Sequence, residues 1–122
     1  MTKTAFLFAG QGAQYLGMGR DLYGHYPIVK ETIDQASQVL GYDLRHLIDT
    51  EEEKLNQTRY TQPAILATSV AIYRLLKEKG YQPDMVAGLS LGEYSALVAS
   101  GALDFEDAVA LVAKRGAYME EA

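Results

Sequence analysis

The sequence predicts an α/β fold in which parallel strands are flanked by helices. Two short apolar runs, residues 4–9 and 84–89, have the length and composition of buried strands. Longer segments between and after them repeat their apolar residues with the period of a helix. The second run leads directly into a glycine-flanked turn at residues 88–92, which joins a strand to a helix.

Length and composition limit what the chain does. Its 122 residues suit one small domain, with an ordinary 48% hydrophobic and 22% charged residues. The net charge of -5 argues against nucleic acid as a partner, because phosphate binding needs a basic face. The absence of cysteine excludes disulfides and thiol catalysis. Residues 4–9 are too short for a membrane span and lack the long apolar region of a signal peptide, so we expect a cytoplasmic protein with no membrane partner.

The first strand is followed by a glycine-rich loop at residues 10–19. Its first two glycines have the spacing of a dinucleotide-binding loop, but Tyr15 replaces the third glycine and argues against that function. The side-chain amides of Gln11 and Gln14, with closely spaced backbone donors, suit an oxyanion or a carbonyl ligand. The alternative is a flexible connection without a ligand.

Helices are expected over most of the remaining chain. A proline or a capping side chain marks the start of three of them, at Pro27, Asp43 and Asp104. The glutamates at residues 51–53 are expected to form a solvated, charged turn. The expected helical segments are residues 20–26, 27–40, a short helix after residue 43, 61–79, 93–100 and 105–120.

The turn at residues 88–92 is the strongest functional signal. A G-x-S-x-G sequence between a strand and a helix is the pattern of a nucleophile elbow. The chain reverses within about one residue, so the serine adopts a strained backbone conformation and a Cβ on either flanking glycine would clash. This turn would lift the Ser90 hydroxyl from the sheet and aim the N–H of Leu91 at an oxygen on the attacked carbon. The alternative is a glycine-rich turn in which Ser90 only caps the helix.

Arg115 is the unexpected residue of the last helix. It falls on the same stripe as the apolar residues expected to be buried, which are Phe105, Ala108, Val109, Val112 and Met119. An inward guanidinium needs an anionic partner or a group of carbonyls. It therefore either snorkels or forms an internal salt bridge, or it serves as a fork for a substrate carboxylate. His25 and His46 are expected at the surface and not as catalytic bases.

Four sequence blocks follow one another across essentially the whole chain. They are FLFAGQGAQYLGMG at 6–19, YTQPAILATSVA at 60–71, GLSLGEYSALVASGAL at 88–103 and KRGAYM at 114–119. In order and spacing they resemble the malonyl-CoA:acyl carrier protein transacylases of fatty-acid synthesis, and the related acyltransferase domains of polyketide synthases.

The resemblance implies roles for five residues. Ser90 would take the malonyl group as an ester, and the backbone N–H groups of Gln11 and Leu91 would form the oxyanion hole. Arg115 would hold the free carboxylate of the malonyl group, and Gln62 would line the site. The implied partners are malonyl-CoA and acyl carrier protein, with neither a cofactor nor a metal.

The resemblance also implies that residues 1–122 are the N-terminal portion of an α/β-hydrolase-like core. The inserted ferredoxin-like subdomain and the C-terminal part, which supplies the family's catalytic histidine, would be absent. No histidine follows Ser90 here, and two strands make a poor sheet. We therefore expect a fragment or one chain of a split enzyme, nearly inactive without the remaining part of its own enzyme. A serine hydrolase of the esterase or lysophospholipase type and a non-catalytic module remain alternatives.

Overall fold

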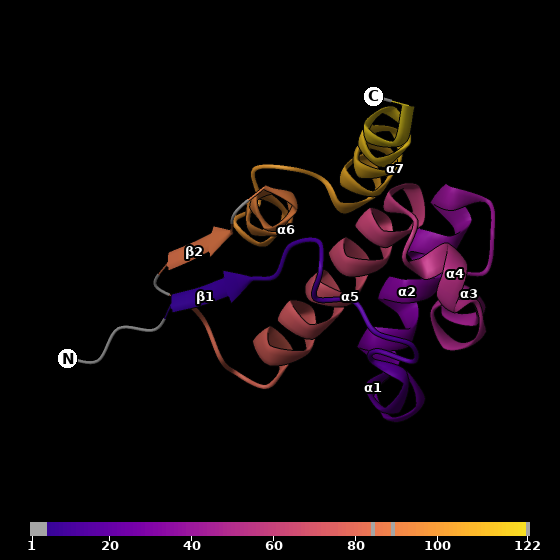
Figure 1. Ribbon diagram of the computed structural model, residues 1–122. Helices are drawn as coiled ribbons and strands as arrows, with labels where there is room; N and C mark the ends of the chain where they lie inside the picture. Colours follow the sequence, from indigo (N-terminus) through magenta and orange to yellow (C-terminus); the bar gives the residue numbers. More distant parts are fainter. Residues whose placement is uncertain (1–4, 84, 89, 122) are drawn as a thin grey trace.

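The computed structural model describes residues 5–83, 85–88 and 90–121. Figure 1 shows the two strands at one end of the molecule, helices α1 to α4 at the other, and the long helix α5 between them. The elements in chain order are β1 (Ala5–Phe8), α1 (Arg20–His25), α2 (Pro27–Leu40), α3 (Leu44–Thr50), α4 (Glu52–Leu55), α5 (Thr58–Glu78), β2 (Met85–Gly88), α6 (Leu91–Ala99) and α7 (Phe105–Glu121).

The two strands pair in parallel, as the sequence predicts. Ala5 lies opposite Met85 at the start of the register, so the carboxyl ends of both strands lie at the same edge of the sheet. Residues 4, 84 and 89 of the predicted strands lie outside the described residues. The rings of Phe6 and Phe8 contact Tyr73 of α5, with centroids 6.1 and 6.3 Å apart. α5 therefore covers one face of the sheet.

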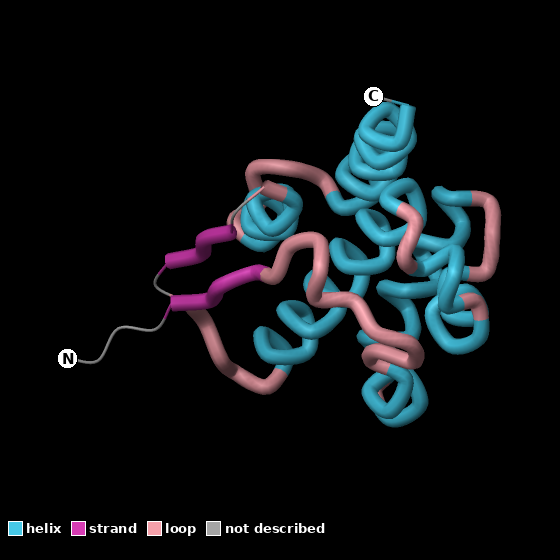
Figure 2. Tube along the Cα trace, in the orientation of Figure 1, coloured by secondary structure: helices cyan, strands magenta, loops and turns pink. Residues whose placement is uncertain are grey.

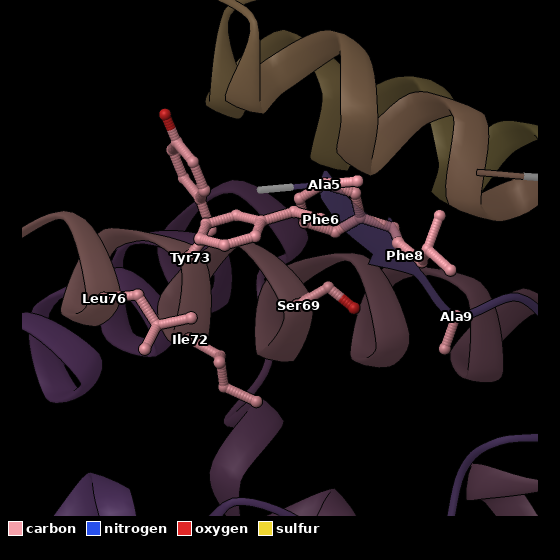
Figure 3. Close-up of a pocket in the computed structure, with 9 residues that line it drawn as sticks. Ala5, Phe6, Phe8, Ala9, Ser69, Ile72, Tyr73 and Leu76 are labelled. Atoms are coloured by element: carbon pink, nitrogen blue, oxygen red, sulfur yellow. The ribbon is translucent and has the colours of Figure 1, made fainter. Parts of the chain in front are cut away.

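The described residues leave the opposite face of the sheet uncovered, so the prediction of buried strands is wrong for this structure. Leu7 is 82% exposed and Met85 is 65% exposed. Continuous apolar strands are typical of parallel sheets with helices on both faces, and here the described residues supply a cover on one face. Figure 3 shows an apolar pocket between β1 and α5 whose lining includes Phe6, Phe8 and Tyr73. None of the five predicted site residues lines this pocket.

The main core lies among the helices around α5. Its largest fully buried side chains include Ile33 of α2, Leu66 and Val70 of α5, Leu91 of α6 and Val109 of α7. α6, which follows Ser90, and α7, which carries Arg115, therefore pack into the same core. No helix among the described residues is long and apolar enough to cross a membrane.

The predicted helix starts at Pro27, Asp43 and Asp104 are confirmed. α2 begins at Pro27 and is followed by Gly41 in the left-handed conformation, with φ 82°. The carboxylate of Asp43 accepts a hydrogen bond from the N–H of His46 at 3.0 Å. The carboxylate of Asp104 accepts from the N–H groups of residues 106 and 107 at the start of α7. These caps satisfy backbone donors that have no partner within the helix.

Three local predictions are wrong. The helix expected to start at residue 61 begins at Thr58 instead, and the hydroxyl of Thr61 donates to backbone carbonyls within the first turns of α5. The glutamate turn is replaced by the short helix α4. Met119 is 46% exposed, and Gly116 takes the buried position at that end of α7.

The long loop between β1 and α1 is held in place on α3 (Figure 2). The N–H of Gly17 donates to the carbonyl of Ile48 at 2.8 Å. The buried guanidinium of Arg45 donates to the carbonyl of Met18 at 2.6 Å and to the carboxylate of Asp49 at 2.7 Å. The end of the loop is therefore fixed, which contradicts the alternative of a flexible connection for that part.

Candidate active site

Ser90 stands in the turn between β2 and α6 with φ 55° and ψ −114°. Among the described residues it is the one non-glycine residue with a positive φ. Such a conformation costs about 1–3 kcal/mol and persists only when the surrounding structure enforces it. The side chain of Ser90 makes no capping hydrogen bond to α6, so the alternative of a helix-capping serine is wrong.

The two glycines of the turn are sterically required. A Cβ on Gly88 would lie 2.1 Å from the carbonyl oxygen of Gly92. A Cβ on Gly92 would lie 2.3 Å from the carbonyl oxygen of Phe8 and 3.3 Å from that of Ala9. The first turn of α6 is therefore pressed against the end of β1, and the sequence pattern identified both positions.

Arg115 of α7 reaches the hydroxyl of Ser90. Its Nη2 donates to Ser90 Oγ at 3.0 Å, and its Nη1 donates to Gln62 Oε1 at 2.8 Å. The guanidinium carbon lies 5.5 Å from the ring centroid of Tyr94 on α6. In the described part of the chain Arg115 forms no salt bridge.

Gln62 connects the arginine to the helix core. It lies in α5 with a fully buried side chain, and its Nε2 donates to the sulfur of Met119 at 3.0 Å. Because this amide nitrogen donates to Met119 on α7, the Oε1 of Gln62 points toward Arg115. Three of the five predicted site residues, Ser90, Arg115 and Gln62, thus form one hydrogen-bonded row.

Gly116 allows α7 to lie close to the start of α5. A Cβ at this position would lie 2.7 Å from the carbonyl oxygen of Thr58 and 2.8 Å from Cα of Arg59. Sequence reasoning missed Gly116, although a glycine inside a helix costs about 1 kcal/mol relative to alanine and so signals a packing requirement. It also missed Tyr94, which lies near the start of α6 with its ring centroid 5.5 Å from the guanidinium carbon of Arg115.

Gln11 and Leu91 lie at the same edge of the sheet. Gln11 follows the end of β1, and its side-chain Nε2 donates to the hydroxyl of Thr58 at 3.1 Å. Leu91 is the first residue of α6 and is buried. Gly92, which follows Leu91, contacts the end of β1, and Gln11 lies shortly after that end. The backbone N–H groups of Leu91 and Gln11 therefore come from two segments that contact each other.

The amide of Gln14 is used within the protein. Its Oε1 accepts from the N–H of Gly12 at 2.8 Å, and its Nε2 donates to Asn56 Oδ1 at 3.0 Å. Both polar ends of this side chain therefore stabilise the loop, and its suggested ligand role stays a prediction. The side-chain nitrogen of Gln11 is likewise bonded to Thr58, and the role predicted for its backbone N–H stays a prediction.

Both histidines are exposed, as predicted. The Nδ1 of His25 lies 2.7 Å from the carbonyl oxygen of Asp21, and the Nε2 of His46 lies 3.2 Å from the hydroxyl of Thr50. They belong to α1 and α3, at the opposite end of the molecule from β2 (Figure 1). Within the described ranges, no group of three or more histidine or acidic side chains is placed to hold a metal ion.

Comparison with protein families gives a match to the acyl transferase domain over residues 5–122. The chain belongs to the acyltransferase family. Among curated relatives, the malonyl CoA-acyl carrier protein transacylases of Haemophilus influenzae and Escherichia coli K12 are 57% and 54% identical to it. The alignments include 100% of this chain and 40% of each relative. The predicted resemblance is confirmed, and the chain spans about two fifths of these relatives' length.

Solved structures agree with this assignment. MCAT from Streptococcus pneumoniae is 94% identical, with a TM-score of 0.96, over 98% of this chain and 39% of that one. A malonyl-transacylase solved in complex with a type II PKS acyl-carrier protein is 52% identical, with a TM-score of 0.94, over 98% of this chain and 40% of that one. The parallel strands and flanking helices of this acyltransferase are therefore part of the larger acyltransferase fold.

Proposed function

We propose that this chain carries the nucleophile of a malonyl-CoA:acyl carrier protein transacylase of fatty-acid synthesis. The hydroxyl oxygen of Ser90 attacks the thioester carbonyl of malonyl-CoA, an ester forms, and coenzyme A leaves as the thiol. The phosphopantetheine thiol of acyl carrier protein then attacks the ester, takes the malonyl group and frees Ser90. The observation that carries this proposal is the hydrogen-bonded row of Ser90, Arg115 and Gln62 at a strained elbow.

Arg115 binds the free carboxylate of the malonyl group in this proposal. Its two terminal nitrogens donate to the neutral oxygens of Ser90 and Gln62. A carboxylate competes well for these donors, because it carries a negative charge and accepts two parallel N–H groups of a guanidinium at once. The same guanidinium that contacts the nucleophile can therefore orient a substrate beside it.

The backbone N–H groups of Gln11 and Leu91 form the oxyanion hole. Leu91 opens α6, so its N–H belongs to the positive end of the helix dipole. Gln11 follows the strand end against which Gly92 packs. Donors fixed before the reaction stabilise the negative charge of the tetrahedral intermediate without reorganisation.

The base that deprotonates Ser90 comes from the remaining part of the enzyme. His25 and His46 are exposed and bonded on α1 and α3. The curated relatives are longer than this chain, which covers 40% of each. We propose accordingly that residues 1–122 form the N-terminal portion of the hydrolase-like core, lacking the inserted ferredoxin-like subdomain and the C-terminal part. Since neither malonyl-CoA nor acyl carrier protein is a membrane component, we place the enzyme in the cytoplasm.

The test uses an enzyme of full length, made by joining residues 1–122 to the remaining part of the Streptococcus pneumoniae MCAT; we call it the chimera. After incubation with malonyl-CoA, peptide mass spectrometry should place a malonyl ester on Ser90, and acyl carrier protein should remove it. Ser90→Ala should form no ester. An adduct on another residue, or one that survives this substitution, refutes the proposal.

The exposure of Ser90 supports a second candidate, a serine hydrolase of the esterase type. In that enzyme water and not a thiol would resolve the ester. Arg115 distinguishes the two, because a bound carboxylate is required for malonyl selectivity and not for hydrolysis of simple esters. Faster transfer to water than to acyl carrier protein in the chimera would favour the hydrolase.

A further inference from the structure

The guanidinium of Arg115 is held by three residues. Its edge donates to Gln62 of α5 and to Ser90 at the start of α6. Its carbon lies 5.5 Å from the ring centroid of Tyr94, one turn further along α6. Tyr94 is half-buried and packs against the helical core.

These contacts use different parts of the guanidinium. The hydrogen bonds use the N–H groups, which lie in the plane of the group and point along its edge. A carboxylate that binds Arg115 takes up donors on this edge and displaces the contact with Ser90. The attraction to an aromatic ring depends instead on the positive charge and the ring face, so a bound carboxylate does not compete for the ring itself.

We propose that Tyr94 is a positioning residue that keeps Arg115 oriented when the substrate carboxylate is bound. This inference rests on the proposed function. Ser90 directly precedes α6 and Tyr94 lies near the start of that helix, so the ring fixes the arginine relative to the nucleophile. Tyr94 thereby contributes to the preference for acyl groups that end in a carboxylate.

The test compares Tyr94→Leu, Tyr94→Met and Tyr94→Phe in the chimera. Leucine and methionine keep an apolar side chain and remove the ring face, whereas phenylalanine keeps the ring and removes the hydroxyl. We expect Leu and Met to raise KM for malonyl-CoA about 3- to 30-fold, the range of an arginine–aromatic contact, with little change in kcat. The rate of Ser90 acylation by acetyl-CoA should stay the same, and Phe should behave like the parent enzyme.

A double variant separates positioning from a general structural role. In an Arg115→Ala background, Tyr94→Leu should no longer change the preference for malonyl-CoA over acetyl-CoA. The inference is wrong if Tyr94→Leu slows both substrates equally, if Phe is as poor as Leu, or if the loss of preference persists without Arg115. If the parent chimera forms no ester on Ser90, the proposed function fails as well. If the ester forms and Tyr94→Leu keeps its preference, the inference alone fails.

Discussion

Replacing Gly116 by alanine tests whether the close crossing of α5 and α7 positions Arg115. The added Cβ would lie 2.8 Å from Cα of Arg59, whereas ordinary contacts begin at 3.4 Å. The neighbouring atoms belong to the backbone of α5 and cannot rotate away. α7 must therefore move by about 0.6 Å or more, together with the adjacent Arg115.

The cost follows from two opposing effects. Overpacking of this size destabilises a protein by about 1–3 kcal/mol. Alanine also favours the helix over glycine by about 1 kcal/mol. Gly24→Ala is the matched control, because Gly24 lies in α1 with no atom within 4 Å of its added Cβ. Gly24→Ala gains helix propensity but adds no steric clash. The free energy of unfolding of Gly116→Ala should therefore be about 1–3 kcal/mol lower than that of Gly24→Ala.

The assay measures both stability and catalysis in the chimera. Thermal unfolding should give a lower midpoint for Gly116→Ala than for Gly24→Ala. Because a shift of about 1 Å in a positioned group can cost about 100-fold in rate, kcat/KM for malonyl-CoA should fall about 10- to 100-fold. If Gly116→Ala matches Gly24→Ala in both measurements, the crossing does not position the arginine.

Three further substitutions test other parts of the account in the same enzyme. Arg115→Ala should lower the preference for malonyl-CoA over acetyl-CoA by about 10-fold or more, because it removes charge-assisted hydrogen bonds of about 1.5–3 kcal/mol. The preference is measured as the ratio of the Ser90 acylation rates. An unchanged ratio contradicts the proposal that Arg115 binds the substrate carboxylate. Gly88→Ala should cost about 3 kcal/mol or more in denaturant unfolding, since its Cβ would lie 2.1 Å from a backbone oxygen; a fully stable variant would show that the turn relaxes. The backbone N–H and the guanidinium of Arg59 lower the pKa of Glu120, so this pair stabilises the protein above the ordinary carboxylate pKa and the effect is lost as pH falls through the lowered pKa. The difference in unfolding midpoint between the parent and Glu120→Gln should therefore shrink from about pH 6 to below about pH 4, and a constant difference contradicts this linkage.

Local signals in the sequence were sufficient to predict many of the element boundaries. Pro27, Asp43 and Asp104 start helices, because each acts through its own backbone or a neighbour a few residues away. The elbow at residues 88–92 is also a local signal, because the turn has no room for a side chain at its two glycines and the sequence shows those glycines directly. The five site residues were predicted by this local pattern together with the family resemblance.

The errors arose where distant segments decide the structure. The start of α5 at Thr58 depends on contacts with α7, since the N–H of Arg59 is satisfied by the carboxylate of Glu120. The exposure of Leu7 depends on how many elements cover the sheet, which a run of apolar residues does not reveal. Tyr94 gains its significance only from the position of Arg115 on another helix.

A crystal structure of the chimera with Ser90 malonylated would show which groups the malonyl ester contacts. We expect that the free carboxylate accepts hydrogen bonds from the guanidinium of Arg115 and that the contact between Arg115 and Ser90 Oγ is gone. We also expect that the ester carbonyl oxygen points at the N–H groups of Gln11 and Leu91. A carboxylate that faces solvent while Arg115 still donates to Ser90 would contradict the account.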